Sequence, residues 1–331
     1  MKTMNRRQLI AFATAFIVSN GLVQFAAAQS VYPNKPIRLV VPFPAGGPTD
    51  VFARQFGARL SALLGQTVII DNKTGASGAI GSVDVKRSAP DGYTLLFGTA
   101  STHGLYNLLS SNPQYDAILD FTHIAIVGGA PVVFAVHPSM PGTLKGVVAI
   151  ARAKPGQIQY GSPGEGTFLH LAAERLKKEA GGIDIQHIPY KGSAQSLPAL
   201  IGGHIALSVD TLGSVLPSHQ AGKLRIVAIA MPKRSPLAPE LPTVDEAIGA
   251  KRFEAVLWNT LAAPAATPAP VIGSLSTATT RVMNDASLHE QLARLAIQPT
   301  TNSTPAAASA YVKAEIAKWK PVVEATGIKL D

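Results

Sequence analysis

The residues best suited to chemistry in this chain are small ones that lie between a predicted strand and a predicted helix. An apolar run at Ile37–Val41 predicts a buried strand, and the turn-forming stretch Pro42–Pro48 follows it. Apolar residues then recur at helical spacing as far as Leu63, and Gly65 suits a C-terminal cap. This arrangement aims backbone N–H groups and the positive end of a helix dipole at one point. The sequence therefore predicts a cradle for an anion, and a carboxylate fits it.

The donors of this predicted cradle are backbone amides and one hydroxyl. Pro48 suits the first helical position, because an N–H there would have no partner within the helix. The amides of Gly46, Gly47 and Thr49, with the Thr49 hydroxyl, then remain as donors for an anion. Asp50 in the first turn either complements the helix dipole or faces the pocket.

The elements around this loop predict a parallel sheet of right-handed βαβ units. Strand-like runs at Thr67–Ile70 and Tyr93–Phe97 are separated by helical patterns at residues 49–64 and 78–88. The third strand ends in Gly98–His103, a loop rich in hydroxyl residues. Because loops that follow parallel strands share one edge of the sheet, this loop is expected near the first cradle.

A second α/β unit repeats the same arrangement further along the chain. A strand at 157–160 precedes the Gly161–Thr167 loop, which opens a helix, and similar loops occur at 189–193 and 210–214. The strand material before this unit is expected at 121–129 and 132–136, and the last third, from Pro270, is expected to be mostly helical. Two such units predict a ligand held between them.

Composition and charge exclude several classes of protein. With 331 residues and 47% hydrophobic content, the chain is globular and long enough to bury two cores. It has no cysteine, which excludes disulfides, thiolate metal sites and cysteine nucleophiles. The net charge of +9 comes from scattered Lys and Arg residues without a basic stripe, so no nucleic-acid partner is expected.

Residues 1–28 have the pattern of a secretory signal peptide. A basic start with Arg6 and Arg7 precedes an apolar run at Leu9–Val18, and small residues end at Ala28. We expect cleavage near Ala28 and a periplasmic mature protein. The general secretory route and the twin-arginine route both stay open.

Motifs of hydrolases and metalloenzymes are absent from the sequence. Neither Gly-x-Ser-x-Gly nor His-Glu-x-x-His occurs, and no two histidines lie three or four residues apart. His103 and His170 deserve weight because they lie beside candidate pocket loops. Catalysis is therefore disfavoured, and neither a metal ion nor another cofactor is expected.

Several short motifs occur together along the mature chain and carry a family resemblance. They are Tyr32–Arg38, Pro42–Asp50, Ala89–Leu95, Tyr160–Ser162, His187–Gly192 and Ala221–Arg225. This combination resembles the Bug-type receptors, the extracytoplasmic solute-binding proteins of tripartite tricarboxylate transporters. The resemblance implies an α/β fold of the type II periplasmic-binding-protein class, with two α/β domains and a ligand cleft between them. Domain 1 would comprise residues 29–124 and 229–331, and domain 2 would be inserted at 125–228.

The resemblance also implies which residues face the ligand. In the first domain these are Phe43, Ala45, Gly46, Gly47, Thr49, Asp50, Thr99, Ser101 and His103. In the second domain they are Ser162, Gly164, Thr167, Tyr190 and Asp210, with Lys191 beside them. Alternatively, Lys191 is a solvated loop charge and Asp210 a helix cap. Glu165 departs from the family because it enters a loop that is normally neutral. It either points to solvent or repels a second carboxylate and favours an amine or neutral tail.

The expected function is that of a receptor without catalytic activity. A monomer would capture a small carboxylated metabolite and deliver it to a membrane permease of the tripartite tricarboxylate transporter type. Two alternatives stay open: a ligand-sensing accessory protein that docks on a sensor kinase, and a periplasmic hydrolase with an unrecognised set of catalytic residues.

Overall fold

The computed structural model describes residues 32–330, so the predicted signal peptide at residues 1–28 lies outside the described part of the chain. By their contacts, Lys35–Asp331 form one compact unit. Within residues 32–330, no helix combines the length and the apolar character that spanning a bilayer requires.

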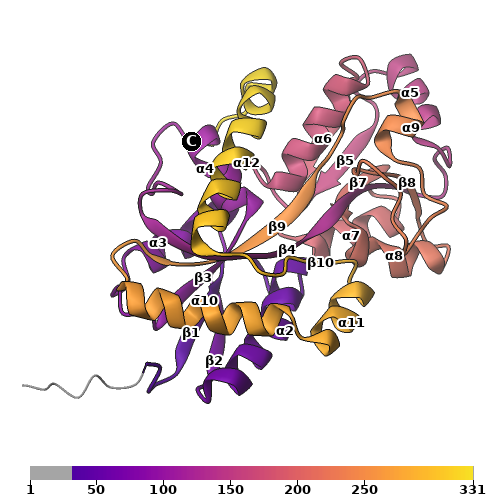
Figure 1. The fold of residues 1–331 in the computed structure, drawn as a ribbon. Helices are drawn as coiled ribbons and strands as arrows, with labels where there is room; N and C mark the ends of the chain where they lie inside the picture. Colours follow the sequence, from indigo (N-terminus) through magenta and orange to yellow (C-terminus); the bar gives the residue numbers. More distant parts are fainter. Residues whose placement is uncertain (1–31, 331) are drawn as a thin grey trace, which may run out of the picture. The chain divides into compact units, whose positions relative to one another are not determined.

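A ten-stranded sheet runs through this unit (Figure 1). Its strand order is β2-β1-β3-β9-β4-β7-β5-β6, and β8 and β10 also pair with β4. The strands are β1 (Ile37–Val41), β2 (Val68–Asn72), β3 (Thr94–Thr99), β4 (Phe121–Val136), β5 (Gln159–Ser162), β6 (Gln186–Pro189), β7 (Leu207–Thr211), β8 (Arg225–Ile229), β9 (Val256–Pro264) and β10 (Gln298–Pro299).

The pairing of these strands confirms the parallel arrangement predicted for the first three, and the sheet as a whole is mixed. β1 lies parallel to β2 and β3, and β5 lies parallel to β6 and β7. Between these groups, β9 is antiparallel to both β3 and β4, and β4 is antiparallel to β7. The sheet is therefore mixed. β9, which comes late in the chain, lies between β3 and β4.

β4 is one strand of 16 residues, whereas the sequence predicted two separate strands here. Its first part pairs with β9, as far as Pro131 opposite Val256, and its second part pairs with β7 and β8 from Val132 onwards. β4 and β9 thus connect the β1–β3 part of the sheet to the β5–β8 part. The domain boundaries expected near residues 125 and 228 stay a prediction.

Helices cover the sheet and place their first turns at the ends of strands (Figure 1). α10 packs against α2, and α12 contacts β4 and α6, so the last third is mostly helical as predicted, and Pro321 lies inside α12. The helices are α2 (Pro48–Leu64), α3 (Ala79–Lys86), α4 (Tyr106–Leu109), α5 (Leu144–Ala153), α6 (Phe168–Glu179), α7 (Ser193–Ile201), α8 (Leu212–Gln220), α9 (Val244–Ile248), α10 (Ala269–Met283), α11 (Ala286–Arg294) and α12 (Pro305–Thr326), with the short turns η1 (Ala76–Gly78) and η2 (Ala100–Leu105).

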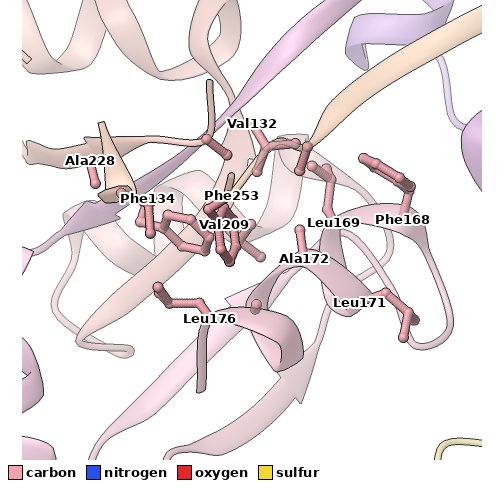
Figure 2. Close-up of a cluster of buried hydrophobic side chains, with 14 of the residues drawn as sticks. Val132, Phe134, Phe168, Leu169, Leu171, Ala172, Leu176, Val209, Ala228 and Phe253 are labelled. Atoms are coloured by element: carbon pink, nitrogen blue, oxygen red, sulfur yellow. The ribbon is translucent and has the colours of Figure 1, made fainter. Parts of the chain in front are cut away.

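A large apolar cluster fixes α6 against the sheet (Figure 2). Leu169 and Leu176 of α6 are buried together with Phe134 of β4, and Phe134 meets Phe253 edge to face at a centroid distance of 6.0 Å. Each such side chain contributes about 1.5–3 kcal/mol through burial. This packing holds the first turn of α6 in place, and that turn forms part of the site described next.

Candidate ligand-binding site

A cavity lies where the first turns of several helices meet, and it encloses about 510 Å³, counting the part open to solvent. Of the predicted site residues, Phe43, Ala45, Gly47, Thr49, Ser101 and Thr167 line it. Pro44, Pro48, Pro163, Leu169, Gly192, Ser193, Ala194 and Leu257 complete the lining. The structure thus brings the first loop of the chain together with loops that lie more than a hundred residues later.

Helix starts supply the polar part of this cavity. α2 begins at Pro48 after its cap Gly47, α6 begins after its cap Thr167, and α7 begins after its cap Gly192. Each of these starts contributes one hydroxyl to the lining: Thr49 at α2, Thr167 at α6 and Ser193 at α7. η2 contributes the hydroxyl of Ser101. Amides in the first turn of a helix have no partner within the helix, and the dipole makes that end positive. Among the described residues, no charged side chain lines the cavity. The Thr167 hydroxyl donates to the Gly164 carbonyl at 2.7 Å, and the Phe168 amide donates to Ser101 Oγ at 2.9 Å, so an anion in the cavity would depend on the other amides and hydroxyls at these helix starts.

Asp50 is buried and fixes the loop between β1 and α2 by hydrogen bonds. Its carboxylate is only 2% exposed and accepts hydrogen bonds from the Gly46 amide and from Arg54 Nε, each at 2.9 Å. Asn72 Nδ2 donates both to Asp50 Oδ1 at 2.9 Å and to the Phe43 carbonyl at 3.0 Å. The Gly46 amide, which the sequence assigned to a bound anion, is therefore occupied by Asp50. Gly46 itself lines a neighbouring pocket.

The pKa of Asp50 follows from these contacts. Burial alone would raise the pKa, but hydrogen bonds from Arg54, Gly46 and Asn72 outweigh it and lower the pKa below its ordinary value. Asp50 therefore stays charged and acts as a brace for the loop in this structure, in addition to complementing the dipole of α2. Asn72 was missed by sequence reasoning, because its partners are far away in the chain.

η2 presents Ser101 to the cavity and buries its neighbours. Thr99 is fully buried, and its hydroxyl accepts hydrogen bonds from the amides of Ser101 and Thr102. His103 is 1% exposed, packs against the Phe121 ring at a centroid distance of 4.9 Å and contacts Thr102 Oγ1 at 2.9 Å. Burial and the neighbouring His123 lower the pKa of His103 well below its usual value, so its ring is neutral. Neither Thr99 nor His103 lines the cavity in this structure, and both shape η2, so their contact with a ligand stays a prediction.

The loop before α6 is shaped by two stacked histidines. Ser162, which is fully buried, bonds to His187 Nε2 at 2.7 Å and accepts the Gly164 amide at 3.2 Å. The Gly166 amide donates to His170 Nδ1 at 3.0 Å, and the two imidazole rings stack at 3.8 Å. Burial lowers the pKa of His170 to about 3 and that of His187 to about 4, so both rings are neutral near pH 7. Ser162 therefore holds the loop and, contrary to expectation, does not line the cavity.

A second hollow adjoins the cavity and shares part of its wall. Gly164 and Tyr190, both predicted site residues, line this hollow together with Glu165 and Lys191. The shared wall consists of Phe43, Pro44, Pro163, Thr167 and Gly192. Glu165 and Lys191 are both exposed, so this hollow carries charged side chains where the first cavity carries none.

Asp210 is buried at the end of β7 and lines neither space. Oδ1 accepts the Thr211 amide at 2.7 Å, whereas Oδ2 has no partner in hydrogen-bond geometry among the described residues. Burial raises the pKa of Asp210 to about 6, although the hydroxyls of Ser193, Ser214 and Thr211 favour its charged form. The cap of α8 is Thr211, so the alternative that Asp210 caps this helix is wrong.

Within residues 32–330, no group of three or more His, Asp or Glu side chains is placed to hold a metal ion. The polar groups that the cavity offers a ligand are hydroxyls and the amides and dipoles of helix starts.

Known proteins are similar to this chain over most of its length. The family model described as the tripartite tricarboxylate transporter family receptor, TctC, matches residues 52–328. BugT of Bordetella pertussis is 34% identical over 331 residues, which covers 99% of this chain and 100% of BugT.

Two solved structures of R. palustris proteins are also similar. One, solved with adipate, is 35% identical, with a TM-score of 0.85 over 90% of this chain and 99% of its own. The other is MatC with bound malate, which is 29% identical, with a TM-score of 0.83 over 88% of this chain and 100% of its own. The chain accordingly belongs to the TctC family of Bug-type receptors, which are extracytoplasmic solute-binding proteins and not enzymes.

Proposed function

We propose that this receptor captures a small dicarboxylate in the periplasm and delivers it to a permease of the tripartite tricarboxylate transporter type. The observation that carries the proposal is the convergence of the starts of α2, α6, α7 and η2 on one cavity without charged side chains. Such a cavity selects an anion through amides and hydroxyls. Relatives that were solved with adipate and malate support the class of ligand.

One carboxylate of the ligand would lie in the cavity, and the remainder would extend into the adjoining hollow. The shared wall at Phe43 and Thr167 makes the two spaces neighbours. Each charge-assisted hydrogen bond contributes about 1.5–3 kcal/mol. A few of them would support micromolar or tighter binding.

Ligand capture would depend on closure of the two proposed domains, residues 29–124 with 229–331 and residues 125–228. The Phe168 amide donates to Ser101 Oγ at 2.9 Å, and Ser77 Oγ donates to the Glu165 carbonyl. These bonds join the two proposed domains beside the cavity, while β4 and β9 connect them through the sheet. A ligand that adds contacts only in the closed arrangement shifts the equilibrium towards it.

Isothermal titration calorimetry with mono-, di- and tricarboxylates, amino acids and aromatic acids tests the proposal. We expect one tight ligand among the dicarboxylates and weak or no binding of amino acids. A response to none of these compounds would overturn the proposed function. Co-purification of the receptor with its permease, and not with a sensor kinase, is the expected result for the partner.

The side chain of Glu165 is expected to determine which ligand binds. It lines the hollow that would receive the far end of the ligand. Replacing Glu165 by glycine should improve the affinity for a dicarboxylate relative to that for a ligand with a neutral or amine tail, because the repulsion of a second carboxylate is removed. Glu165→Gln serves as the control that keeps the size of the side chain. Unchanged relative affinities in both variants would mean that Glu165 points to solvent.

Export and processing belong to the same proposal. We propose cleavage near Ala28, after the small residues that end the signal-peptide pattern. Mass spectrometry of the protein from the periplasmic fraction is expected to give a mature chain that begins close to Gln29.

A further inference from the structure

The loop Gly164–Thr167 is held from outside by three separate parts of the chain. Ser77 Oγ of η1 donates to the Glu165 carbonyl, and Ser101 Oγ of η2 accepts the Phe168 amide at 2.9 Å. The third contact comes from Leu330, which is apolar and lies near the end of the described chain. This loop forms walls of both the cavity and the hollow, so what holds it also shapes the ligand site.

The backbone of Leu330 is fixed beside α4. Its amide donates to the Leu109 carbonyl at 2.9 Å, and it forms a parallel bridge with Ser110. Its side chain is partly buried and packs against the core cluster that includes Leu109 and Phe168, and also against the cluster that includes Tyr106. Leu330 therefore has a defined place in the fold and does not extend freely into solvent.

The side chain of Leu330 rests directly on Gly166. A Cβ atom built on Gly166 would lie 2.5 Å from Leu330 Cδ2 and 2.8 Å from Leu330 Cγ, closer than such contacts occur. Gly166 also has a φ of 63°, in the left-handed region that glycine adopts most easily. Leu330 thus occupies the space that any side chain at Gly166 would need, and it lines the hollow next to Ser77 and Glu165.

We propose that Leu330 is a positioning residue for ligand binding: its side chain holds the Gly164–Thr167 loop in place and so prolongs retention of a bound ligand. The inference rests on the proposed function, since it concerns the same ligand site. Ser77 forms an exposed polar contact that water can replace, whereas the polar contact of Ser101 is buried. The Leu330 contact is apolar, and water does not substitute for it.

The test compares Leu330→Ala with the rescue variant Leu330→Met and with Lys329→Ala, an exposed neighbour that serves as a matched control. Ligand dissociation is measured by stopped-flow displacement of the dicarboxylate that the wild-type protein binds most tightly. We expect Leu330→Ala to release this ligand roughly tenfold faster with little change in the association rate. Leu330→Met should restore slow release, and Lys329→Ala should behave as the wild-type protein does.

Hydrogen exchange of the unliganded protein gives a second measurement that needs no ligand. We expect faster exchange of the Gly166 and Phe168 amides in Leu330→Ala, with unchanged exchange in β1 and β3. Dissociation within twofold of wild type, or unchanged exchange of these amides, would overturn the role of Leu330. If the wild-type protein binds none of the carboxylates, the proposed function fails, and the exchange measurement still decides whether Leu330 holds the loop.

Discussion

Replacement of Asp50 by alanine is expected to weaken dicarboxylate binding by roughly ten- to a hundredfold and to lower the free energy of unfolding by about 1–3 kcal/mol. The buried carboxylate accepts the Gly46 amide and the Asn72 side chain, and both donors would lose their partner. Gly46 is exposed and Asn72 is half-buried, so water can reach both donors, and each lost hydrogen bond costs about 0.5–1.5 kcal/mol. Without this brace the loop that lines the cavity through Phe43 and Gly47 would no longer be held in one conformation.

Arg54→Ala is the matched control for this prediction. Arg54 bonds to the same carboxylate oxygen, but its side chain is 51% exposed, so the ion pair contributes at most about 1 kcal/mol. Urea unfolding and titration calorimetry of both variants separate the two roles. If Asp50→Ala keeps wild-type affinity, the loop is held by other contacts and the brace interpretation is wrong.

The first loop could be predicted from the sequence because its signals are local. The apolar run of β1, Pro48 at the first position of α2 and Gly65 in the left-handed conformation at its end all follow from short-range backbone preferences. The structure confirms each of these elements. The position of η2 beside the first loop followed from the same reasoning, since β1 and β3 are parallel and the loops after them meet at one edge of the sheet.

The supports of the site could not be predicted in this way. Asn72 reaches Asp50 across 22 residues, and His187 reaches Ser162 across 25, so no local spacing marks either pair. β9 lies between β3 and β4 in the sheet although it is far from both in the sequence. The alternation of strands and helices does not predict this position. His103 was assigned to the ligand through the family resemblance, but η2 turns its ring into the core. Side-chain direction within an irregular turn depends on tertiary packing and not on residue type alone.

The absence of charged side chains from the lining of the cavity, as far as the described residues show, has a consequence for how binding responds to pH. Amides, hydroxyls and helix dipoles do not titrate near neutrality, and the nearby histidines are neutral because burial lowers the pKa of His170 and His187. A buried carboxyl next to the start of α7 then becomes the main titrating group close to the cavity. That group is Asp210.

Dicarboxylate affinity is expected to rise as the pH falls from 8 to 5.5, and Asp210→Asn is expected to remove this dependence. The pKa of Asp210 is raised to about 6, so the carboxyl is charged at pH 8 and largely protonated at pH 5.5. Ser193, one of the hydroxyls around it, lines the cavity. The charged carboxyl would repel a bound carboxylate, and a repulsion of about 1.4 kcal/mol already lowers the affinity roughly tenfold. Asp210→Asn should therefore bind the dicarboxylate more tightly than wild type at pH 8 and equally at pH 5.5.

The same substitution has a predicted effect on stability, with a sign that follows from the direction of the shift. A carboxyl whose pKa is raised from 3.8 to about 6 in the folded state stabilises the fold fully below pH 3.8, and this contribution is lost as the pH rises through 6. Over this window the wild-type protein should lose about 3 kcal/mol relative to Asp210→Asn. Because other acids titrate in both proteins, the difference between their unfolding free energies is the quantity to measure.

Calorimetric binding in two buffers of different ionisation enthalpy should also show proton uptake near pH 6.5 for the wild-type protein and none for the variant. An equal pH dependence in both proteins would place the titrating group elsewhere, and the unpartnered Oδ2 of Asp210 would then have no part in ligand binding.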